Sequence, residues 1–140
     1  MRLLLDTNVI LDVLTGREPM VKDSAAVLTY IDEGHAVGLV AAHAVTTIYY
    51  LLTKHSGQAK ASAAIVDLIN LVRVAPVDHE VILQALSLGW RDFEDAVQGA
   101  AAVRAQATHL ITRNPKDFSA HTLPVLSPGE FLALVRHKGK

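Results

Sequence analysis

Residues 3–14 read LLLDTNVILDVL. The leucine run is short and continuously apolar, as a strand covered on both faces should be, and it passes through Asp6 into a helical pattern. Similar runs follow along the chain, and the predicted strands are residues 2–5, 37–41, 72–77, 109–112 and 124–126. Longer helical patterns lie between them, at residues 8–14, 22–33, 44–54, 58–70, 80–88, 94–106 and 129–136. This alternation predicts an α/β fold in which helices cover both faces of a mostly parallel sheet of about five strands.

Length and composition indicate a single globular domain over residues 1–140. Of the 140 residues, 51% are hydrophobic and 19% are charged, which is enough for an apolar core. No repeat or linker divides the sequence, and the basic tail, residues 136–140, is expected to fray.

Charge and cysteine content exclude several classes of function. The chain has no cysteine, which excludes disulfides, thiolate nucleophiles and sulfur-bound zinc. A formal charge of −1 excludes a strongly basic nucleic-acid coat but allows a basic rim around an acidic pocket. The first apolar run is too short for a signal peptide, and no run approaches the ~20 residues that span a bilayer. We therefore expect a cytoplasmic protein without a membrane segment.

Acidic residues stand beside the predicted strands at three distant points. Asp6 directly follows the first strand, and Asp117 lies shortly after the fourth. The segment WRDFEDAVQGAA opens a long helix with Asp92, Glu94 and Asp95. Ligands of an open α/β sheet bind outside the carboxyl ends of its strands, and in a parallel sheet those ends share one edge. We therefore expect these carboxylates to converge.

Each acidic residue taken singly also has a structural interpretation. Asp6 and Asp92 each stand where a side chain caps a helix, and Asp117 fits a turn after Asn-Pro. Asp12 and Glu94 are predicted to be exposed on their helices. Converging carboxylates repel one another, however, and a hard divalent cation with oxygen ligands removes that repulsion. The joint pattern predicts a site for Mg²⁺ or Mn²⁺ that hydrolyses a phosphodiester.

Three segments together resemble the PIN-domain family, in particular its small single-domain VapC-like ribonuclease toxins. They are LLLDTNVILDVL at residues 3–14, RDFEDAVQGAAA at 91–102 and LITRNPKDF at 110–118, and they occur in the family's order. The resemblance runs from Arg2 to about Phe131. It implies a parallel α/β sheet flanked by helices and Mg²⁺- or Mn²⁺-dependent cleavage of RNA. The partners it implies are RNA, a small antitoxin protein that covers the acidic groove, and a second copy of the chain in a homodimer.

The resemblance also assigns roles by position. The residues it implies to be catalytic are Asp6, Asp95 and Asp117. The metal ligands, direct or through water, are these three together with Asp92 and Asn114. Three further residues would contact these ligands rather than the metal and would orient them: Asn8, Thr112 and Thr47.

One position departs from the family pattern. In the segment AAHAVTTIYYLL, residues 41–52, Thr47 stands where the family has a glutamate. A neutral hydroxyl is a weaker ligand and brings one negative charge less, so a lower metal affinity is expected. Two residues are candidates to fill the gap: His43, four residues earlier on the same helix face, and Glu18, in the loop after the first helix.

Basic residues flank the acidic ones. Arg91 precedes the middle cluster, and Arg113 and Lys116 stand on either side of Asn114. Cations around an acidic pocket would hold RNA phosphates, although each residue alone is equally compatible with ordinary solvated charge. Only 5% of the residues are aromatic, which argues against an extended base-stacking platform.

Residues and resemblance together predict a metal-dependent endoribonuclease, the toxin of a toxin–antitoxin pair. Two alternatives stay open at this point. Thr47 is compatible with a degenerate PIN domain that binds RNA or a protein partner without cutting. A receiver-like phosphoryl-transfer domain would need an acidic residue after a central strand and a lysine after a later one. No acidic residue ends the predicted strand at residues 37–41, and the residue after the strand at 109–112 is Arg113 rather than a lysine, so this chain does not fit that pattern.

Overall fold

The computed structural model describes residues 1–118 and 123–138, and its elements follow the predicted alternation. The strands are β1 (Arg2–Leu5), β2 (Val37–Ala41), β3 (Arg73–Ala75), β4 (His109–Ile111) and β5 (Val125–Leu126). The helices are α1 (Thr7–Leu14), α2 (Val21–Asp32), α3 (Ala42–Ser56), α4 (Gln58–Leu71), α5 (His79–Leu88), α6 (Phe93–Arg104) and α7 (Pro128–Lys138), with a 3₁₀ turn, η1 (Pro115–Phe118).

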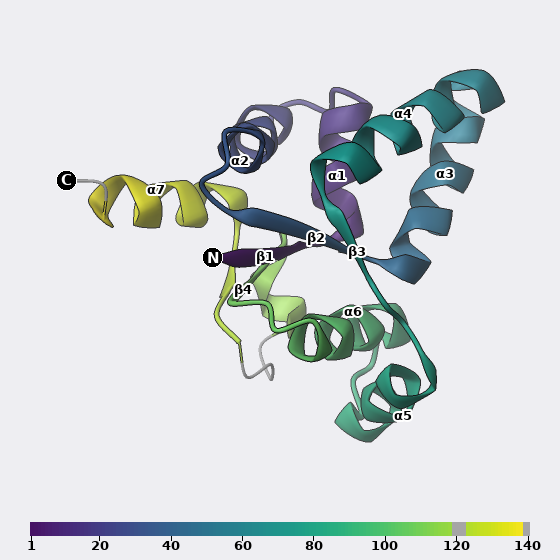
Figure 1. The fold of residues 1–140 in the computed structure, drawn as a ribbon, viewed down its shortest axis with the longest axis vertical. Coiled ribbons are helices and arrows are strands. Elements are labelled where there is room, and N and C mark those ends of the chain that lie inside the picture. The colour runs from purple at the N-terminus through teal and green to yellow at the C-terminus, as the bar shows by residue number, and fades with distance from the viewer. Residues whose placement is uncertain (119–122, 139–140) are drawn as a thin grey trace.

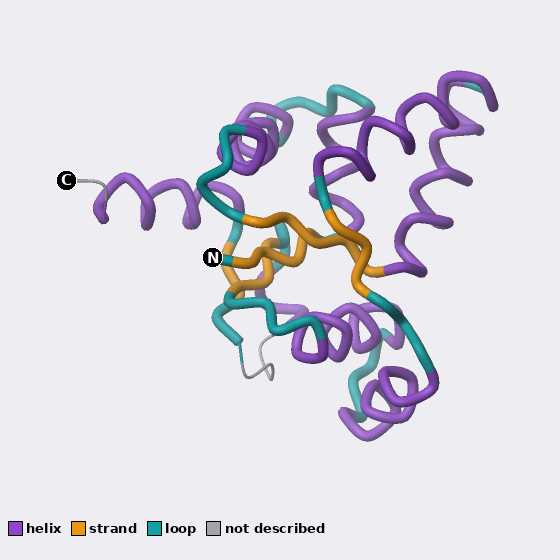
Figure 2. Tube along the Cα trace, viewed as in Figure 1, coloured by secondary structure: helices purple, strands orange, loops and turns teal. Residues whose placement is uncertain are grey.

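The strands form a single parallel sheet in the order β3-β2-β1-β4-β5 (Figure 2). β1 is central: Leu4 pairs with Leu39 of β2 on one side and with Leu110 of β4 on the other. The leucines of β1 have no exposed surface because helices cover both faces of the sheet. The predicted α/β fold with a parallel five-stranded sheet is confirmed.

Helices form a layer on each side of the sheet (Figure 1). α1, α2, α3 and α4 lie on one side, and α5 and α6 lie on the other, while α7 packs against α2 at one end. α6 approaches β2 and β4 through a run of small buried residues, Gly99 to Ala102. α3 and α4 pack against each other as a helical hairpin, and Gly57 between them has a φ of +88°, which residues with a Cβ rarely adopt.

The ends of the elements lie within two residues of the prediction, and three of the differences affect how the chain is read. β3 ends at Ala75 rather than at residue 77, because Pro76 has no N–H to donate to a ladder. The turn after Asn114 winds into η1. α7 continues to Lys138, so the backbone of residues 136–138 is helical where a frayed tail was predicted, and residues 139–140 lie outside the described part.

Within residues 1–118 and 123–138, no helix combines the length and the apolar character needed to cross a bilayer.

Gly38 of β2 is expected to tolerate no side chain. A Cβ there would lie 2.7 Å from Val72 Cγ1 and 2.9 Å from Ile31 Cδ1, both in the core. We predict that Gly38→Ala lowers the free energy of unfolding by about 1–3 kcal/mol, measured by urea denaturation. In the control Gly129→Ala, the new Cβ meets only the carboxylate end of Asp23, so an equal loss there would contradict the steric explanation.

Candidate active site at the carboxyl edge of the sheet

Asp6 stands where β1 ends and α1 begins, and its carboxylate is held from two sides. The residue is only 5% exposed. Thr112 Oγ1 donates a hydrogen bond of 2.8 Å to Asp6 Oδ2, and Gln98 Nε2 donates one of 2.9 Å to Oδ1. Asp6 occupies the N-cap position of α1, but its side chain makes no capping hydrogen bond. The capping interpretation of Asp6 is therefore wrong, because the carboxylate faces β4 and α6 instead.

Gln98 is a site residue that the sequence analysis missed. It is 1% exposed in α6, and its Oε1 also accepts a 3.4 Å hydrogen bond from the backbone N–H of Thr7. The amide thus joins α6 to the start of α1 as well as to Asp6. A signal was present in the sequence: a lone polar residue within a helix of alanine, valine and glycine must find partners if that helix is buried.

Asp95 lies in the first turn of α6, where negative charge accumulates. Asp92 caps this helix, because its Oδ1 accepts a 3.1 Å hydrogen bond from Asp95 N–H, so the capping interpretation of Asp92 is confirmed. Burial is the largest cause that raises the pKa of Asp95 to about 7, and the carboxylates of Asp92, Asp6, Asp117 and Glu94 contribute the rest of the rise. The fold therefore brings acidic residues from three distant segments within electrostatic reach of one another.

A hollow of about 390 Å³ opens over these carboxylates. It is lined by Asp92, Asp95 and Asp117 together with Arg91 and Trp90. Asp95 is half-buried, whereas Asp92, Asp117 and Arg91 are exposed at the rim. Solvent and ligands can therefore reach the acidic groups from one side.

The segment after β4 is tied to Asp6 through Thr112. The backbone N–H of Asn114 donates a 3.2 Å hydrogen bond to Thr112 Oγ1, and the N–H of Asp117 donates one of 3.0 Å to the carbonyl of Asn114. Phe118 then anchors the end of η1 in the core, with its ring edge-on to Trp90 at 5.7 Å between centroids. The side chains of Asn114 and Asp117 remain exposed.

Asp12 is fully buried, so the prediction of an exposed helix residue was wrong. α2 and α3 both pack on α1, and they cover even the polar side of this short helix. Asp12 Oδ1 lies 3.4 Å from Arg113 Nη1 and 3.9 Å from Arg17 Nε. Burial raises the pKa of Asp12, and the two guanidinium groups oppose the rise. Arg113, a predicted RNA contact, pairs with Asp12 in this structure, and its side chain is 24% exposed.

Comparison with known proteins agrees with this fold. The family described as PIN domain matches residues 2–116. The chain belongs to the PIN-domain family. Ribonuclease VapC1 of Aquifex aeolicus (strain VF5) is 27% identical over 135 residues, which cover 93% of this chain and 92% of that protein.

Solved structures share the architecture of this PIN domain. VapBC2 from Rickettsia felis, bound to a DNA fragment from its promoter, superposes with a TM-score of 0.72 at 13% identity, covering 91% of this chain and 98% of that chain. A toxin–antitoxin complex from Klebsiella pneumoniae superposes with a TM-score of 0.68 at 20% identity, covering 89% of this chain and 96% of that one. At these identities the likeness establishes the fold.

Thr47, where the family has a glutamate, and its two possible substitutes, His43 and Glu18, do not line the acidic hollow of this PIN domain. Thr47 Oγ1 donates a 3.5 Å hydrogen bond to the carbonyl of His43 within α3. The ring of His43 stands beside Glu94 in the first turn of α6; burial lowers its pKa, and Glu94 opposes the fall. Glu18 is exposed between α1 and α2 and is not among the carboxylates that act on Asp95. Asn8 is half-buried in the first turn of α1.

The donor set of the PIN domain suits a hydrated hard cation. In the described ranges, no three acidic or histidine side chains lie close enough together to hold a metal ion on their own. Mg²⁺ is commonly bound through one or two carboxylates and keeps several waters, so it needs no such cage. The donors here are oxygens, and the pKa of Asp95 is raised by burial and by neighbouring carboxylates, whose repulsion a cation would relieve. Each oxygen of Asp6 retains a second lone pair beside its hydrogen bond.

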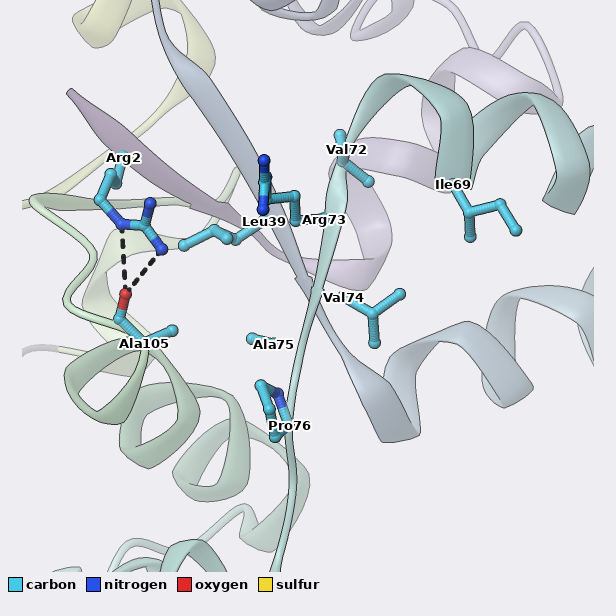
Figure 3. Close-up of a pocket in the computed structure, with 9 residues that line it drawn as sticks. All are labelled: Arg2, Leu39, Ile69, Val72, Arg73, Val74, Ala75, Pro76 and Ala105. Atoms are coloured by element: carbon cyan, nitrogen blue, oxygen red, sulfur yellow. Dashed lines mark hydrogen bonds between the residues drawn. The ribbon is translucent and has the colours of Figure 1, made fainter.

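A different hollow, of about 410 Å³, lies beside the edge strand β3 (Figure 3). Apolar residues of β2, β3 and α4 line it together with Arg2 and Arg73. The guanidinium of Arg2 is held by hydrogen bonds of 3.2 and 3.0 Å to the carbonyl of Ala105. None of the predicted site residues lines this hollow, so the acidic one is the candidate active site.

We predict that Asp95→Asn removes a pH-dependent loss of stability. Because the folded-state pKa of Asp95 is about 7 and the ordinary pKa of an aspartate is 3.8, the folded protein keeps a proton that the unfolded chain releases. The stability of the wild type therefore falls between pH 4 and pH 7 through this group. At pH 8 the variant should be more stable by about 1–2 kcal/mol, after allowance for solvent screening of a half-buried group.

Chemical denaturation at pH 5 and pH 8 measures this difference. Asp67→Asn, at an exposed position on α4, is the matched control and should follow the wild type. Parallel pH profiles for Asp95→Asn and the wild type would contradict the assignment.

Proposed function

We propose that this PIN domain is a metal-dependent endoribonuclease that hydrolyses RNA phosphodiesters at the acidic hollow. One observation carries the proposal: the fold brings Asp6, Asp92 and Asp117, from three separate segments, within electrostatic reach of the half-buried Asp95, and burial together with these carboxylates raises the pKa of Asp95 to about 7. Such an accumulation of like charge destabilises a fold unless a bound cation neutralises it. The name of the Aquifex aeolicus relative, a ribonuclease, supports RNA as the substrate.

Asp6 and Asp95 would hold Mg²⁺ or Mn²⁺ directly. Asp6 is suited to this role because hydrogen bonds from Thr112 and Gln98 fix its carboxylate before any ligand arrives. Further ligands, direct or through water, would be Asp117, Asp92 and Asn114. Held by these residues, a divalent cation would supply an activated water for attack on phosphorus and positive charge for the developing negative charge on the phosphate.

Two exposed cations are positioned to hold RNA beside the metal site. Arg91 lines the hollow, and Lys116 is exposed in η1 next to Asp117. Contacts with phosphate position a nucleic acid without reading its sequence. We expect both residues to contribute to RNA binding rather than to the chemical step.

The proposed biological role is that of a toxin neutralised by a small antitoxin protein. The Klebsiella pneumoniae structure with the same fold is a toxin–antitoxin complex, which supports a protein partner for this chain. A homodimer and a cytoplasmic location stay predictions from the sequence and the family resemblance.

Cleavage of RNA is the direct test of the proposed activity. We predict that the wild type cleaves RNA with Mg²⁺ or Mn²⁺, that a chelator stops it, and that Asp6→Asn/Asp95→Asn lowers the rate by about 100-fold or more. Asp67→Asn should cleave like the wild type. Activity that survives in the double variant is contamination and removes the proposal, whereas RNA binding without cleavage by the wild type would establish a degenerate domain.

Binding of the metal should be visible without RNA. An ion that binds only the folded state stabilises it by roughly 2.7 kcal/mol at one hundred times its dissociation constant. We predict a rise in Tm with Mg²⁺ or Mn²⁺ that is larger at pH 8 than at pH 5.5, because Asp95 must lose its proton to act as a ligand. The absence of any shift at either pH, or an equal shift in Asp6→Asn/Asp95→Asn, would contradict the site.

A further inference from the structure

We propose that Asp12 and Arg113 are positioning residues: their buried ion pair fixes the turn that carries Asn114 and Asp117 against α1 and thereby sets the geometry of the active site. The consequence for catalysis rests on the function proposed above. The consequence for the turn itself does not, because it follows from contacts within the chain.

Asp12 is a charged group placed where water does not reach. Its side chain is 0% exposed, and a buried carboxylate is unfavourable unless a cation compensates it. Two arginines approach the same oxygen. Arg113 Nη1 is the nearer at 3.4 Å, and Arg17 Nε lies at 3.9 Å in a side chain that is 53% exposed. Arg113 is therefore the main internal partner of Asp12.

Arg113 also stands in the chain between the residue that binds Asp6 and the turn that carries Asn114 and Asp117. It stands between Thr112, whose hydroxyl donates to Asp6, and Asn114, whose N–H donates back to Thr112. Asp117 follows through its N–H bond to the carbonyl of Asn114. Asn114, Lys116 and Asp117 are exposed, so their side chains do not fasten the turn to the protein.

The turn is consequently attached to α1 at two points. Thr112 holds Asp6 at the start of the helix, and Arg113 holds Asp12 one to two turns further along the same helix. Phe118 anchors the far end of the turn in the core, so the two contacts with α1 fix how the near end, with Asn114, lies against that helix. Catalytic groups need such support, because a displacement of about 1 Å can reduce a rate about 100-fold.

Paired substitutions separate positioning from stability. Asp12→Asn or Arg113→Gln alone leaves one charge buried without its partner, and we expect Tm to fall by about 5 °C or more. Asp12→Leu/Arg113→Met replaces the pair by apolar groups, which often restores stability, so its Tm should lie close to that of the wild type. Arg17→Gln is the matched control, since it removes the other arginine beside Asp12 without touching the turn.

Amide hydrogen exchange measured by NMR reports on the turn directly. In Asp12→Leu/Arg113→Met we expect the N–H groups of Asn114 and Asp117 to exchange at least about tenfold faster, while those of β1 stay as in the wild type. In Arg17→Gln all of them should stay unchanged. Unchanged exchange in the double variant, or an equal effect in Arg17→Gln, would overturn the proposal.

Steady-state kinetics of RNA cleavage test the consequence for catalysis. We expect kcat for RNA cleavage to fall about tenfold or more in Asp12→Leu/Arg113→Met, with KM changed less than about threefold, because the RNA contact of Arg91, outside the turn, remains. Wild-type kcat in this variant would overturn the positioning role. If the wild type itself neither cleaves RNA nor binds Mg²⁺, the proposed function fails, and hydrogen exchange still decides whether the pair holds the turn.

Discussion

Parallel pairing of β1 with β4 places Asp6 and Thr112, which are 106 residues apart in the sequence, at the same level of the sheet. The backbone N–H of Asp6 donates to the carbonyl of Ile111, and this bond sets the end of β1 beside the end of β4. The hydroxyl of Thr112 then meets the carboxylate of Asp6 without any adjustment of the loops. α6 lies on the opposite face of the sheet from α1 and begins near the same carboxyl edge, so that Asp95 in its first turn lies close to Asp6. An antiparallel arrangement of the same strands would separate these residues by the length of a strand.

The electrostatics of this edge are unfavourable for the protein alone. The carboxylates of Asp92, Asp95 and Asp117 line the hollow together with Arg91, and the carboxylate of Asp6 acts on Asp95 from the end of β1. The guanidinium of Arg113 pairs with Asp12. Arg91 and the exposed Lys116 are therefore the cations that face solvent beside this negative charge. Proteins commonly give up stability at such places because the function of the site requires it.

The sequence was informative wherever a local pattern carried the signal. Apolar runs and helical spacing placed the strands and helices to within a few residues, and Pro76 shows why β3 stops short. The same rules placed Asp6, Asp95 and Asp117 at one edge. Local patterns do not reveal which helix covers which, and this is why the burial of Asp12 under α2 and α3 was not foreseen. The choice between capping and other roles also depended on tertiary partners, and it differed between Asp6 and Asp92.

The contacts of Gln98 limit which residues can replace it at position 98. Glutamate has nearly the same shape as glutamine, so steric fit alone would permit the exchange. An ionised carboxylate at this place would have no hydrogen to give and would set like charge 2.9 Å from Asp6 Oδ1. Because the backbone of Thr7 donates to the same amide, the start of α1 depends on that neutral group as well. A lineage that keeps Asp6 in this buried position therefore needs a hydrogen-bond donor rather than an ionised carboxylate at position 98.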